Sequence, residues 1–230
     1  MMKILATDTS TDILTVAVCD EHAVLAEIVV HAPRAHSERL LSTAHNLLAQ
    51  AGLSLGGLDA LAVGIGPGSF TGLRIGIAAW KGLALGAGLP LAGVPSLDAL
   101  ARLHAGAERP VCPVLDARMG EVFYSIHDPG ALGLSRRLGP AVGPVSELIA
   151  RIDGPVLLAG DGAIRYREEL AAGLPEARFA PPLQNHPRAA AVAFEGVRLL
   201  EAGESGDAGA VRPVYLRKSQ AERKREEAGT

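Results

Sequence analysis

The glycine-rich stretch Gly64–Gly72 reads GIGPGSFTG and stands between two apolar segments, residues 58–65 and 73–85. Such a loop between a strand and a helix is typical of phosphate sites, because glycines let an anion approach the backbone and helix N-termini attract negative charge. The dinucleotide fingerprint requires G-x-G-x-x-G and an acidic residue about 20 positions later, yet residues 84–97 contain neither Asp nor Glu. A Walker A loop requires Lys after its last glycine, whereas Leu73 and Arg74 follow Gly72. The stretch therefore predicts either another kind of phosphate site or a tight turn.

Two further groups of residues could do chemistry. The turn Asp8–Thr11 offers one carboxylate and three hydroxyls, which could hold a hydrated metal or a phosphate, although the same residue types also form ordinary turns. His36 stands beside Ser37 and Glu38 at the start of an amphipathic segment, as acid-base or metal residues could. The position one helical turn later is Leu40, so a helical pair of metal ligands is missing. We expect no metal site, and the alternative is a polar helix start.

Two helices must position these residues. The spacing of leucines and alanines predicts an amphipathic helix over residues 36–51, which Gly52 ends. A second helix is expected over residues 72–88, capped by Ser69 or Thr71 and apolar on most sides. A ridge of small residues on it should let another helix approach closely; its members are Gly72, Gly76, Ala79 and Gly86. Because charges interrupt the helix and Pro90 ends it, it does not read as a membrane span.

Composition limits the class of protein. The chain has 230 residues, of which 48% are hydrophobic, and this suits one large or two small globular domains. A net charge of -3 and an aromatic content of 3% give neither a basic field nor stacking groups for nucleic acid, so a role with RNA would need a partner. The two cysteines cannot form a disulfide framework, and residues 1–3 lead directly into a strand instead of a signal peptide. We expect a cytoplasmic protein.

The order of predicted elements indicates an internal duplication. Strands are expected at residues 3–8, 13–20, 23–30, 58–65 and 91–94, with helices at 36–51, 72–88 and 96–104. After a link at 105–110 come strands at 111–116, 121–127, 134–138 and 155–160, and helices at 146–151, 163–172 and 187–202. We therefore expect two α/β lobes, residues 1–105 and 106–216. The charged tail, residues 217–230, is expected to be solvated or to touch an RNA or a partner.

Motifs along most of the chain resemble those of the bacterial TsaB (YeaZ) family. They are ILATDTS at 4–10, HSERL at 36–40, GPGSFTGLR at 66–74, DAR at 116–118, GDG at 160–162 and PVYLR at 213–217. The resemblance implies an α/β, two-lobed fold of the actin/sugar-kinase/Hsp70 (ASKHA) type, made of duplicated ribonuclease H-like lobes with the second reduced. It also implies a function in making threonylcarbamoyladenosine at the tRNA position 3′ of the anticodon.

The resemblance further implies partners. Family members act as an accessory subunit that pairs with the catalytic paralogue TsaD, works with the ATPase TsaE, meets tRNA through that complex, and forms homodimers when alone. The pairing surface of the family corresponds to the two first-lobe helices here. We expect ten residues in or beside it: His36, Leu40, Leu41, Ala44, Leu47, Leu48, Gly72, Arg74, Gly76 and Trp80.

Comparison with the catalytic paralogue argues against catalysis by this chain. Where the paralogue carries an H-x-x-x-H metal pair, this sequence has Ser96 and Leu100, and neither side chain can replace an imidazole ligand. The second phosphate loop of the ASKHA fold corresponds to residues 116–119, where bulky side chains stand. We expect a scaffold that binds no cofactor tightly. A weak or interface-shared ATP or ADP with Mg²⁺ would use a remnant site made of Asp8, Thr9, Ser10, Asp116, Gly160 and Gly162.

Two other functions stay open at the level of sequence. A freestanding ATP-dependent small-molecule kinase of the same fold would depend on Asp8 and Asp116. A peptidase could be assembled from Ser10, His36 and Asp8, but the sequence lacks a recognisable nucleophile motif.

Overall fold

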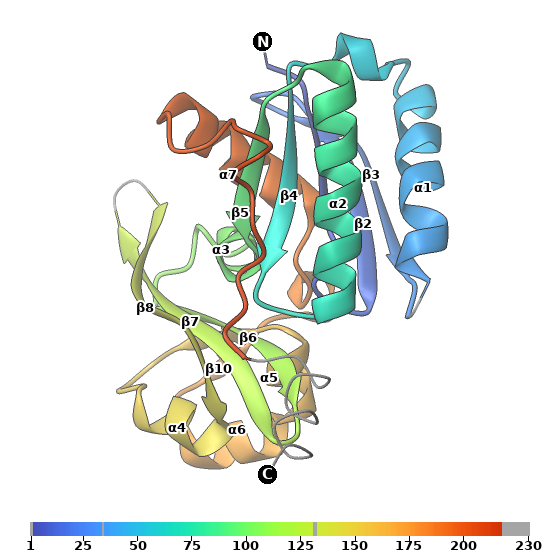
Figure 1. Ribbon diagram of the computed structural model, residues 1–230. Helices are drawn as coiled ribbons and strands as arrows, with labels where there is room; N and C mark the ends of the chain where they lie inside the picture. Colours follow the sequence, from blue (N-terminus) through green and yellow to red (C-terminus); the bar gives the residue numbers. More distant parts are fainter. Residues whose placement is uncertain (1, 34, 131–132, 218–230) are drawn as a thin grey trace.

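Two α/β lobes make up the computed structural model, which describes residues 2–33, 35–130 and 133–217 (Figure 1). The first sheet has the strand order β3-β2-β1-β4-β5 and the second the order β10-β9-β6-β7-β8. Starting from β3 in the first sheet and from β8 in the second, two antiparallel pairings are followed by two parallel pairings. In this order β1 is equivalent to β6, and β4 is equivalent to β9. The predicted duplication of ribonuclease H-like lobes is confirmed.

The first lobe follows the predicted order closely. Its strands are β1 (Ile4–Asp8), β2 (Ile13–Cys19), β3 (Val24–His31), β4 (Ala60–Gly66) and β5 (Leu91–Pro95). Its helices are α1 (His36–Gln50), η1 (Leu55–Gly57), α2 (Phe70–Ala87) and α3 (Ser96–Arg102). Of the two predicted caps of α2, Ser69 is the one observed, since its side chain accepts a hydrogen bond from the Gly72 amide at 3.2 Å.

The second lobe is smaller. Its strands are β6 (Val111–Arg118), β7 (Glu121–Gly130), β8 (Gly133–Pro144), β9 (Leu157–Ala159) and β10 (Arg178–Phe179). The helices in this part of the chain are α4 (Val145–Ala150), α5 (Asp161–Arg165), α6 (Arg167–Gly173), η2 (Pro182–Gln184) and, after the second lobe, α7 (Ala189–Glu201). One helix was expected over residues 163–172, but Tyr166, with φ −105° and ψ 27°, separates α5 from α6. The two-residue β10 is too short for a sequence pattern to predict.

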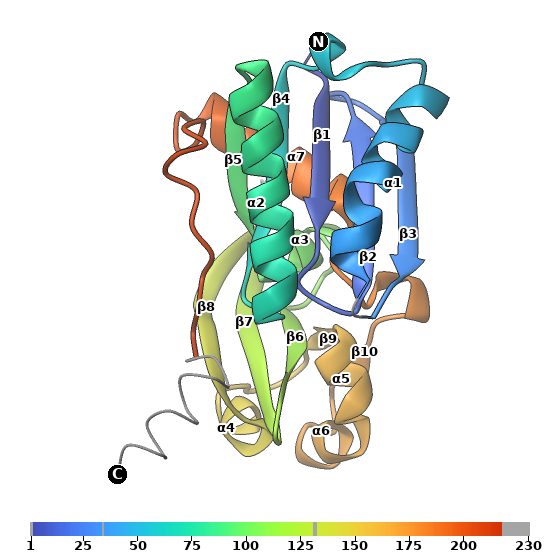
Figure 2. The same ribbon diagram turned by 45° about the vertical axis from the view of Figure 1, so that its right-hand side comes forward.

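Helix α7 corrects the predicted domain boundaries. It lies on the first sheet, although it follows the second lobe in the chain, and it packs on β1, β2, β4 and β5 (Figure 2). That face of the sheet is rich in alanine, and a Cβ added to Gly196 would lie only 2.7 Å from Ala62 Cβ. A sheet has two faces to cover, and α1 and α2 cover only one. The first lobe therefore consists of residues 1–105 together with α7, and the second does not extend to residue 216.

After α7 the chain returns toward the second lobe. Residues 203–217, here called the C-terminal strap, run along the first lobe and end beside β7 (Figures 1 and 2). Leu91 pairs with Gly206, the Val214 amide donates to the Ile65 carbonyl at 2.8 Å, and Arg217 pairs with Glu121 at 2.6 Å. The strap thus connects the two lobes a second time. The rest of the predicted charged tail, residues 218–230, lies outside the described residues.

Two features of the fold concern the cellular environment of the protein. No helix in the described part of the chain is long and apolar enough to cross a membrane. Cys19 and Cys112 are both buried and carry free thiols. Burial is the main reason that the pKa of each thiol is raised, that of Cys19 to about 12.

Candidate functional site

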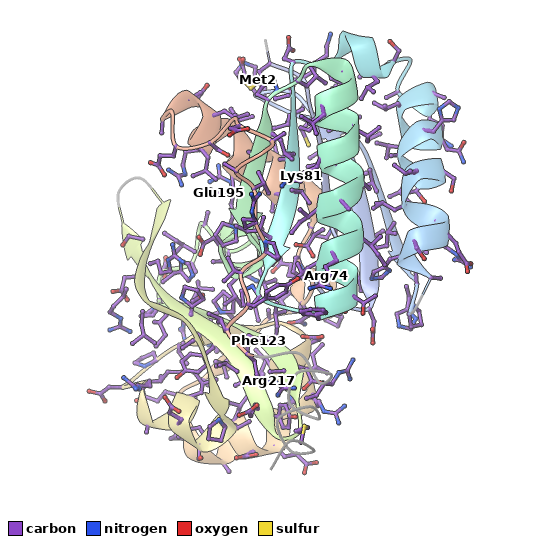
Figure 3. All side chains as sticks on the ribbon, in the orientation of Figure 1. Met2, Arg74, Lys81, Phe123, Glu195 and Arg217 are labelled. Carbon is purple, nitrogen blue, oxygen red and sulfur yellow. The ribbon has the colours of Figure 1, made fainter. Side chains whose placement is uncertain are left out.

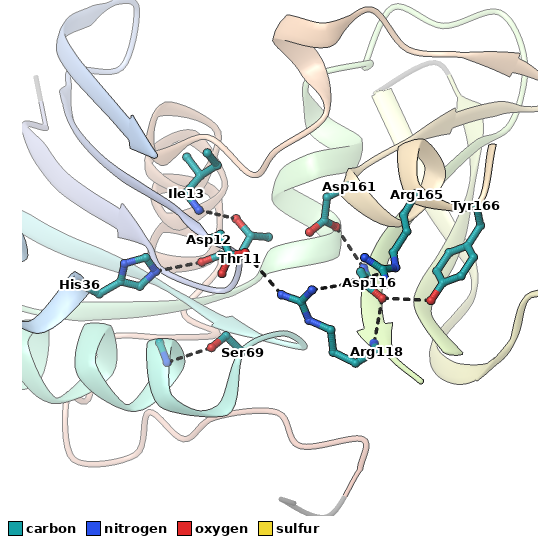
Figure 4. A network of polar contacts seen from close by, with 11 residues as sticks. Thr11, Asp12, Ile13, His36, Ser69, Asp116, Arg118, Asp161, Arg165 and Tyr166 are labelled. Carbon is teal, nitrogen blue, oxygen red and sulfur yellow. Dashed lines mark hydrogen bonds and ion pairs between the residues drawn. The ribbon is translucent and has the colours of Figure 1, made fainter. Parts of the chain in front are cut away.

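A cleft with a volume of about 430 Å³ lies between the lobes. Its walls are the β1–β2 turn (residues 10–12), the start of α2 (68–71), the end of β6 (116–118) and the end of the C-terminal strap (214–217). Figure 4 shows polar contacts crossing this cleft from Asp12 in the first lobe to Arg118 in the second. A nucleotide held by residues of both lobes would have to lie in this cleft, since its walls come from both.

Asp8 faces away from the cleft. Its carboxylate is 1% exposed and accepts hydrogen bonds from the Ser10 amide at 2.8 Å, the Ser10 hydroxyl at 2.6 Å and the Ser96 hydroxyl at 2.7 Å. Burial raises the pKa of Asp8, while these hydrogen bonds act in the opposite direction. A Cβ on Gly64 would lie 2.0 Å from the carboxylate, so this glycine makes room for Asp8. Of the two interpretations of this turn, the contacts of Asp8 support the ordinary turn, because its oxygens bind protein donors inside the lobe; a part for Asp8 in a weak nucleotide site stays a prediction.

Thr9 and the glycine loop form a packing contact. The Thr9 hydroxyl donates to the Gly72 carbonyl at 2.8 Å. A Cβ added to Gly72 would lie 2.1 Å from the Thr9 carbonyl oxygen, and one added to Gly76 would lie 2.4 Å from Thr9 Oγ1. Gly68 similarly makes room for Ser10, because its added Cβ would lie 2.3 Å from the Ser10 carbonyl oxygen. Of the two predictions for this loop, the tight turn is confirmed. The predicted ridge of small residues is wrong as a helix contact at Gly72 and Gly76, since the β1–β2 turn lies against them.

Asp116 lies at the cleft but is already paired. Its carboxylate is 3.2 Å from the Arg118 guanidinium and 3.5 Å from that of Arg165, and it accepts hydrogen bonds from the Arg118 amide and the Tyr166 hydroxyl (Figure 4). The Asp116 amide in turn donates to Asp161 at 3.0 Å. Arg118 also reaches Asp12 at 3.4 Å across the cleft. Protein cations therefore pair with Asp12 on one wall of the cleft and with Asp116 on the other.

Of the remaining remnant-site residues, one lines the cleft and two pack inside the second lobe. Ser10 lines the cleft. Gly160 and Gly162 pack on β6 instead. A Cβ added to Gly160 would lie 2.0 Å from the Val114 carbonyl oxygen, and one added to Gly162 would lie 2.8 Å from the Leu115 carbonyl carbon. Where β6 ends and the turn to β7 begins, two residues have positive φ, Arg118 (65°) and Met119 (56°); a phosphate loop would need small residues there. This donor set does not fit a tightly held magnesium nucleotide.

The peptidase hypothesis finds no support in the geometry. The Ser10 hydroxyl bonds to Asp8, whereas His36 donates from Nε2 to the Thr11 carbonyl at 2.9 Å. The three residues therefore do not form a relay from hydroxyl to imidazole to carboxylate. At the position of the paralogue's metal pair, Ser96 is bonded to Asp8 and Leu100 is fully buried. Within the described ranges, His, Cys, Asp and Glu side chains form no cluster of three suited to a metal ion.

Most of the predicted interface residues belong to the core of the first lobe. Trp80 is 0% exposed and its indole N–H donates to the Leu5 carbonyl at 3.2 Å. Eight of the ten residues are buried: His36, Leu40, Ala44, Leu47, Leu48, Gly72, Gly76 and Trp80. Ala44 and Leu48 still line the groove described below, whereas the other six belong to the packed interior, so for those six the prediction is wrong. Leu41 and Arg74 reach the surface. The helical repeat places apolar residues on one face but does not distinguish a core from an interface.

An exposed apolar surface nevertheless exists on these helices. Leu41 of α1 is 51% exposed and Leu85 of α2 is 71% exposed. Between the helices lies a groove of about 350 Å³ whose walls are mainly apolar: Leu5, Leu41, Ala44, His45, Leu48, Ala49, Leu53, Ser54, Leu55 and Leu83. We call this groove, together with Leu41, Ala78, Gly82 and Leu85, the helix face. The predicted interface did not include Leu85, although the apolar character of α2 on most sides was a signal for it. Figure 3 shows the side chains of α1 and α2 that project outward.

The duplicated lobes, the cleft between them and the closing helix α7 define a protein of the ASKHA fold. Solved proteins of this type include ethanolamine utilization protein EutJ from Carboxydothermus hydrogenoformans, with a TM-score of 0.53 at 17% identity, covering 84% of this chain and 90% of that chain. YeaZ from Pseudomonas aeruginosa is far more similar, with a TM-score of 0.81 and 32% identity over 94% of this chain and 100% of that chain.

Sequence comparisons lead to a narrower group. The family model "TsaD: tRNA N6-adenosine threonylcarbamoyltransferase" matches residues 24–225. The tRNA threonylcarbamoyladenosine biosynthesis protein TsaB of Bacillus subtilis is 31% identical over 97% of both chains. The Escherichia coli TsaB is 46% identical over 127 residues, and this match spans about half of that protein, 54%. The chain belongs to the TsaB (YeaZ) family of tRNA threonylcarbamoyladenosine biosynthesis proteins.

Proposed function

We propose that this protein is a non-catalytic scaffold subunit for threonylcarbamoyladenosine synthesis on tRNA. It docks a TsaD-like catalytic paralogue through the helix face, works with a TsaE-like ATPase, and meets tRNA only through the assembled complex. Without the paralogue, the same face joins two copies. The setting is the cytoplasm, in keeping with two free, buried cysteines.

The exposed helix face is the observation that carries this proposal. Leu41 and Leu85 lie 51% and 71% exposed on neighbouring helices, and Leu41 lines a groove with mainly apolar walls. A buried leucine side chain is worth about 1.5–3 kcal/mol relative to an exposed one, so a partner helix that covers both gains substantially. Apolar side chains at the centre of a contact, with groups excluding water around them, are typical of binding hot spots.

The contacts in the cleft support a non-catalytic role. Asp8 is inaccessible, and Arg118 holds the carboxylates of Asp12 and Asp116. A kinase of this fold would need those carboxylates free for magnesium and for its general base. We therefore place any weakly held ATP or ADP at the interface with the paralogue, and we expect the isolated chain not to turn over ATP.

The test is binding of the purified TsaD paralogue from the same organism, measured by titration calorimetry. Leu41→Asp and Leu85→Asp should each weaken binding at least about tenfold, because each leaves a carboxylate facing apolar surface. Leu183→Asp is the matched control, since Leu183 is 82% exposed on η2 of the second lobe. Unchanged melting temperatures would show that all variants fold. If the wild type fails to bind, or if Leu41→Asp and Leu85→Asp bind as well as Leu183→Asp, docking through the helix face is wrong.

A further inference from the structure

Arg74 is an exposed arginine with a fixed guanidinium. It lies near the start of α2, at the end close to the second lobe (Figure 3). The guanidinium carbon is 4.0 Å from the centre of the Phe70 ring, and Nε donates to the Tyr215 hydroxyl at 3.0 Å. The Phe70 and Tyr215 rings stack on each other with their centres 4.7 Å apart. One face and one nitrogen of the guanidinium are therefore held by neighbours.

The C-terminal strap keeps this arrangement in place. The residue before Tyr215 donates its amide to the Ile65 carbonyl at 2.8 Å, and Arg217, two residues later, pairs with Glu121 in the second lobe. Tyr215 is thus fixed from both sides along the chain. Stacking on an aromatic ring and a hydrogen bond to Nε restrict the rotamers that a free arginine would sample.

The terminal nitrogens of Arg74 are the part left open. Among the described residues, Arg74 forms no salt bridge, and Nε provides its only hydrogen bond. By contrast, Arg118 pairs with Asp12 and Asp116, and Arg188 pairs with Glu27. An exposed, ordered fork of N–H donors matches the geometry of a carboxylate or a phosphate.

We propose that Arg74 is a preorganised anchor for a carboxylate of the protein that docks on the helix face. This inference rests on the proposed function and names the chemistry of one contact within it. Arg74 lies on the same exposed stripe of α2 as Ala78, Gly82 and Leu85, which follow it at helical spacing. A partner that covers these apolar residues brings its own side chains to the end of the stripe, where Arg74 stands.

The surroundings favour a carboxylate of a protein over a phosphate of RNA. The neighbouring exposed residues are apolar, and the other cation of α2, Lys81, is directed to the Gly209 carbonyl at 3.3 Å. The chain as a whole carries a net charge of -3. RNA-binding surfaces instead gather several cations on one face. A single arginine held in place beside an apolar strip is typical of a protein interface, in which arginine is enriched relative to the rest of the surface.

The experiment measures affinity for the purified TsaD paralogue with three variants and one control. Arg74→Gln removes the charge, Arg74→Lys keeps the charge but loses the planar fork, and Tyr215→Phe keeps the stacked ring but removes the hydroxyl that holds Nε. Arg178→Gln, an exposed arginine of β10 in the second lobe, is the control. We expect both Arg74 variants to bind at least about tenfold more weakly, Tyr215→Phe about threefold more weakly, and the control as wild type.

The outcomes separate this inference from the proposed function. If wild type does not bind the paralogue, the proposed function fails and the anchor fails with it. If wild type binds and Leu85→Asp weakens binding while Arg74→Gln does not, docking stands and the anchor is overturned. If Arg74→Lys binds as well as wild type, the planar fork is irrelevant and the inference is equally wrong. A loss of tRNA affinity by the Arg74→Gln complex, with paralogue affinity unchanged, would identify a phosphate as the ligand and overturn the carboxylate.

Discussion

At the scale of single residues, a buried polar cluster joins the lobes. His127 of β7 lies with Nε2 at 2.9 Å from the Ser125 hydroxyl and 3.7 Å from Asp98 of α3, which Arg136 of β8 also approaches at 3.5 Å. Burial, followed by the charge of Arg136, lowers the pKa of His127 to about 4. Burial raises the pKa of Asp98. One imidazole nitrogen faces both the hydroxyl and the carboxylate, so the cluster cannot act as a proton relay.

This cluster should make stability depend on pH. Between the ordinary pKa of 6.5 and the folded value of about 4, the unfolded chain binds a proton at His127 that the folded chain does not. The contribution of His127 is therefore present at neutral pH and lost as the pH falls through this range, by up to about 3 kcal/mol. Asp98 acts in the opposite direction, because its raised pKa lets the folded state bind a proton first.

Urea unfolding at about pH 7 and about pH 4.5 measures the effect. His127→Gln can still bond to Ser125 but cannot titrate, so the loss of stability on acidification should shrink. His45→Gln, on the exposed side of α1, is the control and should leave the pH dependence as it is in wild type. If both variants lose stability in parallel with wild type, His127 is not the group responsible.

At the same scale, the sequence identifies polar residues better than the direction in which their side chains point. The sequence predicts that Asp8, Thr9 and Ser10 lie where β1 passes into a polar turn, yet of these three only Ser10 lines the cleft. Asp8 turns inward because Ser96, far along the chain, offers it a hydroxyl, and Gly64 leaves room for it. Neither contact has a local signal in the sequence, so the direction of the carboxylate could not be predicted.

At the scale of elements, α2 shows what a glycine in a helix can mean. Gly76 is buried against Thr9, whose Oγ1 would lie 2.4 Å from an added Cβ, whereas Gly82 has nothing within 4 Å of its added Cβ. Both are glycines within one predicted helix, and their spacing does not tell them apart. The extent of α2 and its Ser69 cap follow from local patterns, which is why they could be predicted. Which face the protein itself covers depends on the β1–β2 turn and could not.

Alanine substitutions at these two positions should have opposite effects. Gly76→Ala forces a methyl group against the Thr9 hydroxyl and should cost about 1–3 kcal/mol of unfolding free energy. Gly82→Ala, in open space on the same helix, should gain roughly 0.5–1 kcal/mol from helix propensity. Urea unfolding followed by the fluorescence of Trp80, the single tryptophan, measures both. Equal effects at the two sites would contradict the packing described for Gly76.

At the scale of the whole molecule, the lobes share parts of the chain. The duplicated order of strands could be read from the sequence because each element has its own periodicity. The return of α7 to the first sheet could not, since an apolar helix carries no mark of which lobe it covers. The predicted division at residue 105 consequently leaves the first sheet with one face bare.

A fragment of residues 1–105 should therefore not fold cooperatively by itself. It lacks the helix that covers Ile4, Ala6 and Ala62, so an apolar face of its sheet meets water. Joining residues 187–216 to its end through a glycine-serine linker should restore a cooperative urea transition. Circular dichroism and Trp80 fluorescence compare the two. A cooperative transition in the 1–105 fragment alone would show that α7 is dispensable for the first lobe.

The position of α7 in the chain also has a consequence for synthesis. On the ribosome the whole second lobe is translated after the first sheet and before the helix that closes it. The alanine-rich face therefore lacks this helix on every nascent chain until α7 has been translated, and the first lobe, although its strands come first, cannot reach its native form before the second lobe has been made.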